Sequence, residues 1–350
     1  MTFAEARALF PVLERLAYLN AGTFGPVARP TADAVRAQLE TDLDNGRFGK
    51  DYFERMLELR QGAREALGSL VGAPPEHVSL TGSTTDGCNI VLAGLGLRSE
   101  DEIVTTREEH FGLLGPVYAS GARVVAVDAE PDAILAAVTP RTRLLALSQV
   151  LWTTGRVLPV RELREQAGVP VLVDGAQSVG AIPVAADGLD FLTISGQKWL
   201  CGPESTGALV VADPERLRVA RPSYFSQTAH DETGSFEAVA GAARFDPGWI
   251  PLASLAGLLA ALELSPEWRF ERAAEQTARC RELLSPLVDV VPGGATLVSF
   301  RAEDPPALVA TLFDAGIVVR DLPGTGLVRI SCGWWTSDED LDRLALAIAN

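Results

Sequence analysis

The chain has 350 residues, of which 47% are apolar, and a formal net charge of −16 at pH 7. This length exceeds what one simple core supports, and the apolar content is typical of a compact globular protein, which excludes a disordered chain. The negative charge argues against a general nucleic-acid or membrane-surface binder, because both need a basic face.

Short apolar strands alternate with helical stretches between residues 62 and 212. The expected strands cover residues 77–80, 102–105, 123–127, 144–148, 171–174, 191–194 and 207–211. The expected helices between them cover residues 85–94, 110–120, 132–138 and 160–167. Strands built mainly of Val, Leu and Ile between helices indicate an α/β fold with a largely parallel sheet that is buried on both faces.

A polar, turn-rich stretch over residues 214–246 follows, which we expect to wrap the surface or a partner subunit. A helix over residues 250–264 connects it to a second unit. The expected helices of that unit cover residues 266–284, 306–315 and 337–348. Its expected strands cover residues 296–300, 318–320 and 327–331. The pattern predicts a small α+β domain over residues 249–350, with residues 1–14 as a further candidate part, beside a large domain over residues 15–248.

Signals for membranes, secretion and metals are missing from the sequence. No run of about 18 apolar residues is present, and the N-terminus lacks the basic start and apolar core of a signal peptide, so a cytoplasmic protein is expected. The four cysteines form no CxxC pair, which argues against a zinc site or a disulfide framework and suits a reducing compartment. The three histidines are too scattered for a recognisable metal site.

Lysine is nearly absent: the 30 lysine and arginine residues include only two lysines, Lys50 and Lys198. A lysine that survives such a bias is a candidate for chemistry that arginine cannot do, because an amine can lose its proton and attack a carbonyl. Lys198 follows the strand over residues 191–194, close to the hydrogen-bonding side chains of Ser195 and Gln197. The competing explanation is that these two lysines were retained by chance. For Lys50, chance and a chemical role explain the lysine equally well.

Two other strand ends carry polar groups. The loop TGSTTDG over residues 81–87 precedes a helix, whose N-terminal N–H groups and hydroxyls suit a phosphate, although an ordinary helix cap explains the same residues. Asp174 ends a buried strand, where a carboxylate is costly unless it meets a cation or several donors; a cap or a structural ion pair is the alternative. Ligands bind at this end of parallel strands.

An amine, a carboxylate and a phosphate site together match pyridoxal 5'-phosphate. This cofactor needs an amine for its aldehyde, an anion for its protonated ring nitrogen and donors for its phosphate. Nucleotide binding is poorly supported, because the sequence has neither a Walker loop nor a GxGxxG motif after its first strand.

From about Tyr18 to its C-terminus, the chain resembles the class V aminotransferase superfamily of fold-type-I pyridoxal-phosphate enzymes. The superfamily includes cysteine desulfurases, cysteine and cystine C–S lyases, kynureninase and isopenicillin-N-epimerase-like proteins. The segments VDGAQSVG and ISGQKWLCGPESTGALVV carry the resemblance most strongly. It implies the PLP-transferase fold: a large domain with a mostly parallel seven-stranded sheet, a small C-terminal α+β domain, and a homodimer with its active site at the subunit boundary.

The resemblance also implies roles for individual residues. Lys198 holds the cofactor as a Schiff base and shuttles protons, Asp174 pairs with the ring nitrogen, and Gln177 pairs with the ring hydroxyl. The phosphate is bound by Thr84, Thr85, Ser195 and Gln197. His110 matches the residue that stacks on the ring and is the second catalytic candidate, with a helix cap as the ordinary alternative.

Substrate contacts are implied in the same way. Arg329, in LVRISCGWW, matches the arginine that pairs with the substrate carboxylate, a role that suits the bidentate guanidinium; a surface arginine is the alternative. Asn20 and Gly22, in YLNAGTFGP, belong to a segment that lines the mouth of the active site in relatives. Trp152 stands where cysteine desulfurases usually have Asn and resembles some C–S lyase-like members.

The sequence departs from the family pattern in two places. Many cysteine desulfurases have a catalytic cysteine before the carboxylate-binding arginine, but VVRDLPGTGLVRIS contains none, and Cys332 is interpreted as a packing residue. A desulfurase that forms a persulfide on cysteine is therefore disfavoured. Trp249 occupies the neighbourhood where relatives have a Thr that reaches the phosphate of the other subunit, so that contact is not carried over.

These observations favour a lyase that cleaves the C–S bond of cysteine or cystine, with an aminotransferase as the alternative, because both reactions use the residues named above. A regulatory protein without turnover is disfavoured by the intact Lys–Asp pair and the lack of a basic DNA-binding segment. A nicotinamide-dependent dehydrogenase lacks its glycine motif. The expected partner is a small amino acid, with no nucleic acid, membrane or metal.

Overall fold

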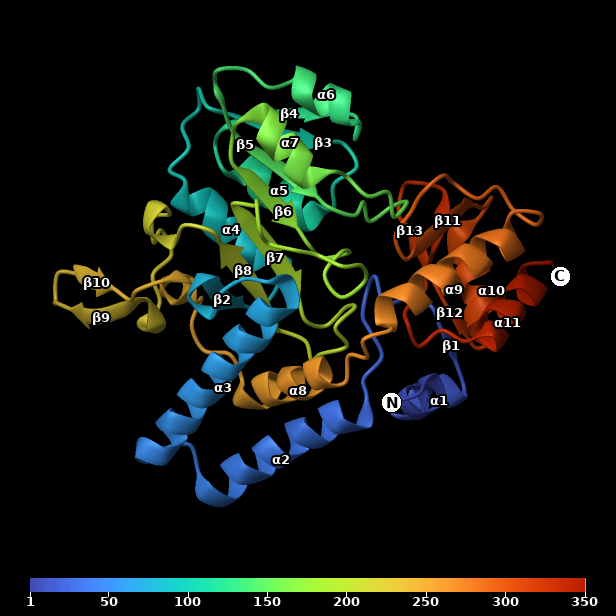
Figure 1. Ribbon diagram of the computed structural model, residues 1–350, viewed down its shortest axis with the longest axis horizontal. Helices are drawn as coiled ribbons and strands as arrows, with labels where there is room; N and C mark the ends of the chain where they lie inside the picture. Colours follow the sequence, from blue (N-terminus) through green and yellow to red (C-terminus); the bar gives the residue numbers. More distant parts are fainter. Residues whose placement is uncertain (350) are drawn as a thin grey trace.

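The computed structural model describes residues 1–349 and is built around a seven-stranded sheet (Figure 1). The strand order is β2-β8-β7-β6-β5-β3-β4. The strands are β2 (Val78–Thr81), β3 (Glu102–Thr106), β4 (Arg123–Val127), β5 (Thr142–Ser148), β6 (Val171–Asp174), β7 (Phe191–Ser195) and β8 (Gly207–Val211). All neighbours pair in parallel except β8, which is antiparallel to both β2 and β7. The predicted α/β fold with a mostly parallel sheet is confirmed.

Helices cover both faces of this sheet because its strands are apolar on both sides. In β5, Leu145 and Leu147 pack into one core cluster, whereas Leu144 and Ala146 pack into the other. The first cluster includes residues of α6 (Pro131–Ala136) and α7 (Val160–Ala167). The second includes residues of α4 (Thr84–Gly94) and α5 (Phe111–Ala119).

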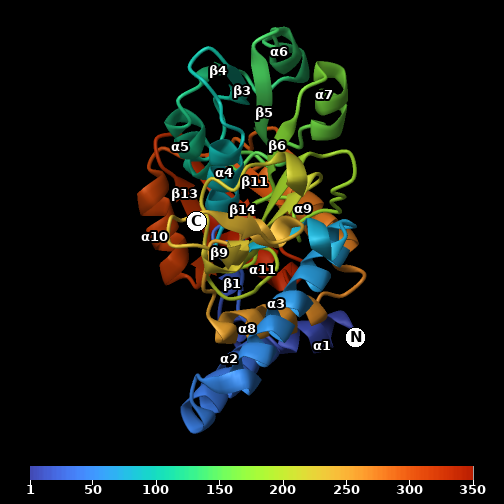
Figure 2. The same ribbon diagram turned by 90° about the vertical axis from the view of Figure 1, so that its left-hand side faces the viewer.

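Two long helices near the N-terminus, for which the sequence analysis gave no prediction, are α2 (Arg29–Asn45) and α3 (Gly49–Val71). Both contact α8 (Leu252–Glu263), and Figure 2 shows α2 and α3 reaching away from the sheet. They lack one strongly apolar stripe: Leu39, Leu43 and Leu57 are exposed.

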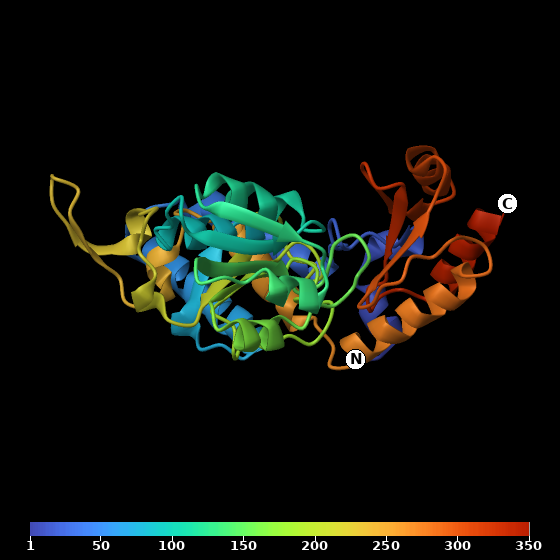
Figure 3. The ribbon, with the colours of Figure 1, turned by 90° about the horizontal axis from the view of Figure 1, so that it is seen from above.

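A three-stranded antiparallel sheet forms the C-terminal unit, which lies beside the large sheet (Figure 3). It contains β11 (Leu297–Arg301), β13 (Arg320–Leu322) and β14 (Leu327–Ser331). Its helices are α9 (Arg269–Leu284), α10 (Pro305–Asp314) and α11 (Asp338–Ala349). The domain boundary between residues 248 and 249 stays a prediction, and residue 350 lies outside the described residues.

The N-terminal segment lies against this C-terminal unit. After α1 (Phe3–Ala8), β1 (Ala17–Tyr18) pairs in parallel with β12 (Ile317–Val318). The strand expected over residues 318–320 is therefore two short strands, because β12 pairs with β1 whereas β13 pairs with β14.

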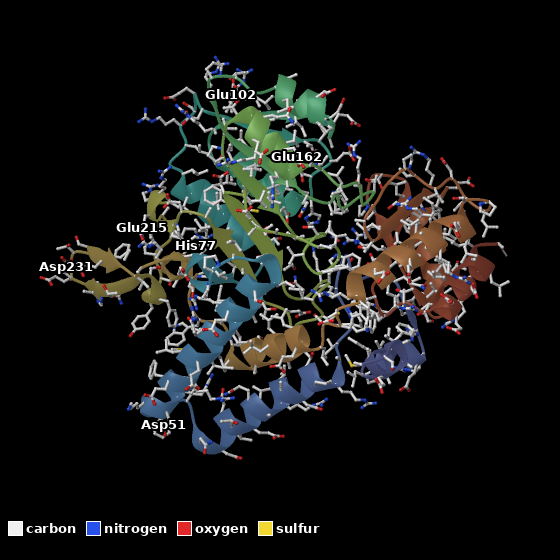
Figure 4. All side chains as sticks on the ribbon, in the orientation of Figure 1. Asp51, His77, Glu102, Glu162, Glu215 and Asp231 are labelled. Carbon is white, nitrogen blue, oxygen red and sulfur yellow. The ribbon has the colours of Figure 1, made fainter. Side chains whose placement is uncertain are left out.

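The polar stretch between β8 and α8 contains short 3-10 helices and a hairpin of β9 (Gln227–His230) and β10 (Phe236–Ala238). Figures 1 and 3 show the hairpin projecting from the end of the molecule that is opposite the C-terminal unit. Figure 4 shows Asp231 at its tip. Within residues 1–349, the helices are all too short or too polar to cross a membrane.

Candidate active site

A cavity of about 250 Å³ lies where β5, β6 and β7 end, between the central sheet and the three-stranded sheet. The last residues of these strands, Ser148, Asp174 and Ser195, line it together with Arg329 of β14. Apart from Asn20, the predicted site residues all line this cavity: Gly22, Thr84, Thr85, His110, Trp152, Asp174, Gln177, Ser195, Gln197, Lys198 and Arg329. The structure therefore brings together residues that are far apart in the sequence.

One side of the cavity is the N-terminus of α4. Ser83 caps this helix, and its hydroxyl accepts a hydrogen bond from the Asp86 N–H at 3.1 Å. The first N–H groups of a helix have no intrahelical acceptor, which leaves those of Thr84 and Thr85 available to a ligand. Together with the positive end of the helix dipole, these groups suit a phosphate.

Asp174 lies deep in the cavity, with 3% of its surface exposed. Its Oδ1 accepts hydrogen bonds from the Ala176 N–H at 2.9 Å and the Thr193 hydroxyl at 3.5 Å. Within residues 1–349 it forms no ion pair. A buried carboxylate with only neutral partners is suited to a cationic group of a ligand.

Gln177 is held from both ends. Its Nε2 donates to the Gly22 carbonyl at 2.8 Å, and its Oε1 accepts from the Trp199 indole at 3.0 Å. The amide orientation is therefore set, and Nε2 keeps its second N–H for a ligand in the cavity.

Lys198 carries the amine of the site. Its pKa is lowered to about 8, mainly because the amine is removed from water. The nearby Asp174 carboxylate acts in the opposite direction, and the charges of Arg329 and Arg320 contribute to the lowering. Across the described part of the chain, its Nζ has no hydrogen-bond or ion-pair partner. The loop around it is fixed from outside: Gly25 N–H donates to the Gln197 carbonyl at 2.8 Å, and a Cβ at Gly25 would clash with the Lys198 carbonyl oxygen.

His110 both caps α5 and lines the cavity. Its Nδ1 accepts a hydrogen bond from the Gly112 N–H at 3.0 Å, and its ring meets Trp152 edge-on with centroids 5.1 Å apart. Partial burial is the main reason that its pKa is lowered, and the charge of Lys198 contributes next. Because Nδ1 accepts the hydrogen bond from Gly112, the proton of the neutral ring lies on Nε2.

Arg329 is a buried cation without a counter-ion. Its side chain donates to the Trp152 carbonyl at 2.8 Å and to the Thr23 hydroxyl at 3.4 Å, whereas Nε has no partner. No carboxylate of residues 1–349 lies within 4.0 Å of it, and burial lowers its pKa to about 9, with the charge of Arg320 second. An unpaired buried guanidinium indicates a site for an anion.

The sequence analysis missed several residues of the site. Thr23, Ser148 and Arg320 also line the cavity, as does Ser83 of the predicted phosphate loop. Arg320 lies directly across from Arg329 in the β13–β14 pairing, a neighbourhood that depends on the register of this hairpin. Asn20 does not reach the wall; its amide oxygen accepts a hydrogen bond from Thr23.

Glu109 lies just behind the wall and was also missed. Its carboxylate accepts hydrogen bonds from the Thr106 hydroxyl at 3.0 Å and the Ser148 N–H at 3.0 Å, which ties the loop before His110 to the end of β5. Burial raises its pKa to about 7.

Comparison with known proteins agrees with this geometry. The family described as "Aminotransferase class-V" matches residues 19–321. Isopenicillin N epimerase of Streptomyces clavuligerus is 29% identical, over 98% of this chain and 97% of that protein. A probable cysteine desulfurase of Halalkalibacterium halodurans is 31% identical, over 99% and 97%. A solved complex of the cystine C–S lyase C-DES with its product cysteine persulfide has a TM-score of 0.92 and 28% identity, covering 97% of this chain and 99% of that one.

The cavity fits the cofactor of this family. The Lys198 amine, the buried Asp174 carboxylate and the free N–H groups of α4 match the aldehyde, ring nitrogen and phosphate of pyridoxal phosphate. Within residues 1–349, no cluster of His, Cys, Asp and Glu could hold a metal ion. The chain belongs to the class V aminotransferase family of pyridoxal-phosphate-dependent enzymes.

Proposed function

We propose that this protein holds pyridoxal phosphate on Lys198 and cleaves the C–S bond of a sulfur amino acid, with cystine as the preferred substrate. The observation that carries the proposal is the pair of guanidiniums, Arg320 and Arg329, which face the cavity without a carboxylate partner within residues 1–349. Cystine carries two carboxylates and a sulfur leaving group on Cβ. The 28% identity to the cystine lyase C-DES, over nearly the whole chain, supports the same choice.

Each residue then has a role that its surroundings support. Arg329 receives the α-carboxylate, and Arg320 attracts the second carboxylate. Thr84, Thr85, Ser195 and Gln197 bind the phosphate. Asp174 would balance the positive charge of the protonated ring nitrogen, and Gln177 would donate a hydrogen bond to the ring hydroxyl. When bound, pyridoxal phosphate withdraws electrons and so makes the Cα–H of the amino acid acidic.

Lys198 is proposed to take the Cα proton through Nζ. Its pKa of about 8 suits this task, since a general base works best near the operating pH. Loss of the Cα proton and of the Cβ–S bond, followed by hydrolysis, converts cystine and water into pyruvate, ammonia and cysteine persulfide. His110, with Nε2 protonated, is proposed to stack on the cofactor ring and to serve as the second proton-carrying group.

The sulfur is proposed to leave in the product and not on the protein. The four cysteines are all buried, and none of them lines the cavity. This supports a lyase over a desulfurase that carries a persulfide on its own cysteine.

A second candidate is epimerisation at Cα, which the full-length similarity to isopenicillin N epimerase favours. The two reactions share removal of the Cα proton by Lys198 and differ in the next step. An epimerase returns a proton to the opposite face of Cα and keeps the Cβ substituent, whereas a lyase releases that substituent.

The test is to incubate the protein, loaded with pyridoxal phosphate, with L-cystine, L-cysteine and pairs of amino acid and 2-oxoacid. We expect cystine to yield pyruvate and cyanide-reactive sulfur in equal amounts, and Lys198→Ala to yield neither. Inversion of Cα without pyruvate would support the epimerase. Amino exchange without sulfur release would identify an aminotransferase, and either result contradicts the lyase.

We also propose that the protein is a homodimer of the cytoplasm. Exposed aromatic side chains support the dimer, since Tyr224 is 65% and Trp249 is 61% exposed. The four free cysteines support a reducing compartment.

A further inference from the structure

Thr23 contacts both cavity arginines through a single hydroxyl. Its Oγ1 accepts hydrogen bonds from Arg320 Nη1 at 3.2 Å and from Arg329 Nη2 at 3.4 Å, and it donates to Asn20 Oδ1 at 2.9 Å. A hydroxyl has one proton to donate and two lone pairs to accept with. Because Asn20 takes the proton, both lone pairs are left for the two guanidiniums.

The hydroxyl orients these cations without neutralising them. Two like charges repel, and within residues 1–349 neither arginine has a carboxylate partner within 4.0 Å. The other protein acceptor of Arg329 is the neutral Trp152 carbonyl. A carboxylate at position 23 would hold the same geometry but cancel the charge, whereas a hydroxyl leaves the positive potential for an incoming anion.

The segment around Thr23 is held firmly between the two sheets. Gly22 N–H donates to Ser331 Oγ of β14 at 3.2 Å, and the Gly22 carbonyl accepts from Gln177 at 2.8 Å. A Cβ at Gly22 would lie 2.7 Å from Arg329 Nη2, which is too close for a side chain. Glycine at this position therefore allows the backbone to approach the guanidinium. The Thr23 hydroxyl is therefore fixed relative to both the cofactor region and the arginines.

We infer that Thr23 is a specificity-determining positioning residue: its hydroxyl, directed by Asn20, orients Arg329 toward the α-carboxylate of the substrate and Arg320 toward the second carboxylate. The inference rests on the proposed role of Arg320 and Arg329 as carboxylate ligands. It also gives Asn20 an indirect role, through Thr23, in place of a direct substrate contact. Loss of the hydroxyl is therefore expected to weaken the binding of ligands that carry a carboxylate and to leave the binding of ligands without one unchanged.

The test compares two small amines that differ only in a carboxylate, glycine and methylamine. Their binding to the enzyme loaded with pyridoxal phosphate is measured by the change in cofactor absorbance for wild type, Thr23→Val and Thr23→Ser. Valine keeps the shape of threonine without the hydroxyl. We expect Thr23→Val to weaken glycine binding about 10-fold, since hydrogen bonds to charged groups are lost, and to leave methylamine binding unchanged. Thr23→Ser, which keeps the hydroxyl, should bind both ligands as wild type does.

A second variant, Asn20→Asp, adds a negative charge beside Thr23 without touching the cavity wall. We expect it to weaken glycine binding and to spare methylamine, because the new carboxylate competes for the guanidiniums. In steady-state assays with cystine, Thr23→Val should raise KM with little change in kcat. Thr41→Val on α2, which also loses a threonine hydroxyl, is the matched control and should change neither ligand.

Equal loss of glycine and methylamine binding in Thr23→Val would mean a merely structural role and would overturn the inference. Unchanged glycine binding would overturn it as well. The proposed lyase activity fails separately, if wild-type enzyme binds glycine but releases no sulfur from cystine.

Discussion

At the scale of single residues, the environment of Lys198 changes how its amine behaves. With the ordinary pKa of lysine, about one amine in 3,000 is neutral at pH 7, whereas a pKa of about 8 leaves about one in ten neutral. Only the neutral amine attacks an aldehyde. The cavity thus prepares Lys198 for attachment of the cofactor before any substrate is present.

This shift predicts how attachment depends on pH. The rate at which the cofactor-free protein binds pyridoxal phosphate covalently should rise with pH and level off above about 8, because the folded state lowers the pKa and the neutral form dominates above it. Stopped-flow absorbance over a range of pH measures this rate. Lys198→Ala, treated with borohydride, should carry no cofactor mass. A rate that keeps rising to the ordinary pKa of lysine would contradict the prediction.

At the scale of elements, Asp246 joins segments that are distant in the sequence. It is fully buried, and its Oδ1 accepts hydrogen bonds from Ser79 Oγ at 3.0 Å and Leu80 N–H at 2.9 Å on β2. Its Oδ2 pairs with Arg60 at 2.5 Å and with Arg64, both on α3. One carboxylate therefore holds α3 against the edge strand of the central sheet.

Asp246→Ala should destabilise the protein by about 3–5 kcal/mol, because it leaves two guanidiniums buried without a counter-ion. The free energy of unfolding in urea measures this loss. Asp33→Ala is the matched control: it removes an ion pair with Arg36 in which both side chains are 69% exposed, and it should cost less than about 1 kcal/mol. If both variants lost a similar amount of unfolding free energy, the buried ion pairs of Asp246 would not stabilise the fold more than an exposed pair does.

At the scale of the whole molecule, exposed aromatic residues gather on one surface. The rings of Tyr224 and Trp249 stack with centroids 6.1 Å apart, and Phe53 and Leu57 of α3 line the same hollow as Tyr224. These side chains are between 45% and 65% exposed. An apolar patch of this kind is expected to be covered by another protein surface, which supports the proposed homodimer.

Light scattering should give a mass twice that of the 37.2 kDa chain. Trp249→Glu should shift the population toward single chains, because a charge in a buried interface is costly. Phe313→Glu places the same charge at another exposed aromatic, on α10, and should leave the mass unchanged. A single-chain mass for the wild-type protein would exclude the dimer.

The sequence by itself determined the strands of the central sheet and the residues at their ends. Runs of Val, Leu and Ile specify buried parallel strands through local composition. Asp174 could be found because it ends such a strand, and Lys198 because it lies three residues after the end of another. Strand ends of a parallel sheet meet at one edge.

Only the tertiary structure decided which distant residues meet these strand ends. Arg320 adjoins Arg329 because of the register of one hairpin, and Thr23 reaches both arginines across about 300 residues of chain. The long helices α2 and α3 lack a strong apolar stripe, so packing against α8 defines them more than local pattern does. Register and long-range packing depend on the whole chain folding together, and a local stretch of sequence carries no signal of them.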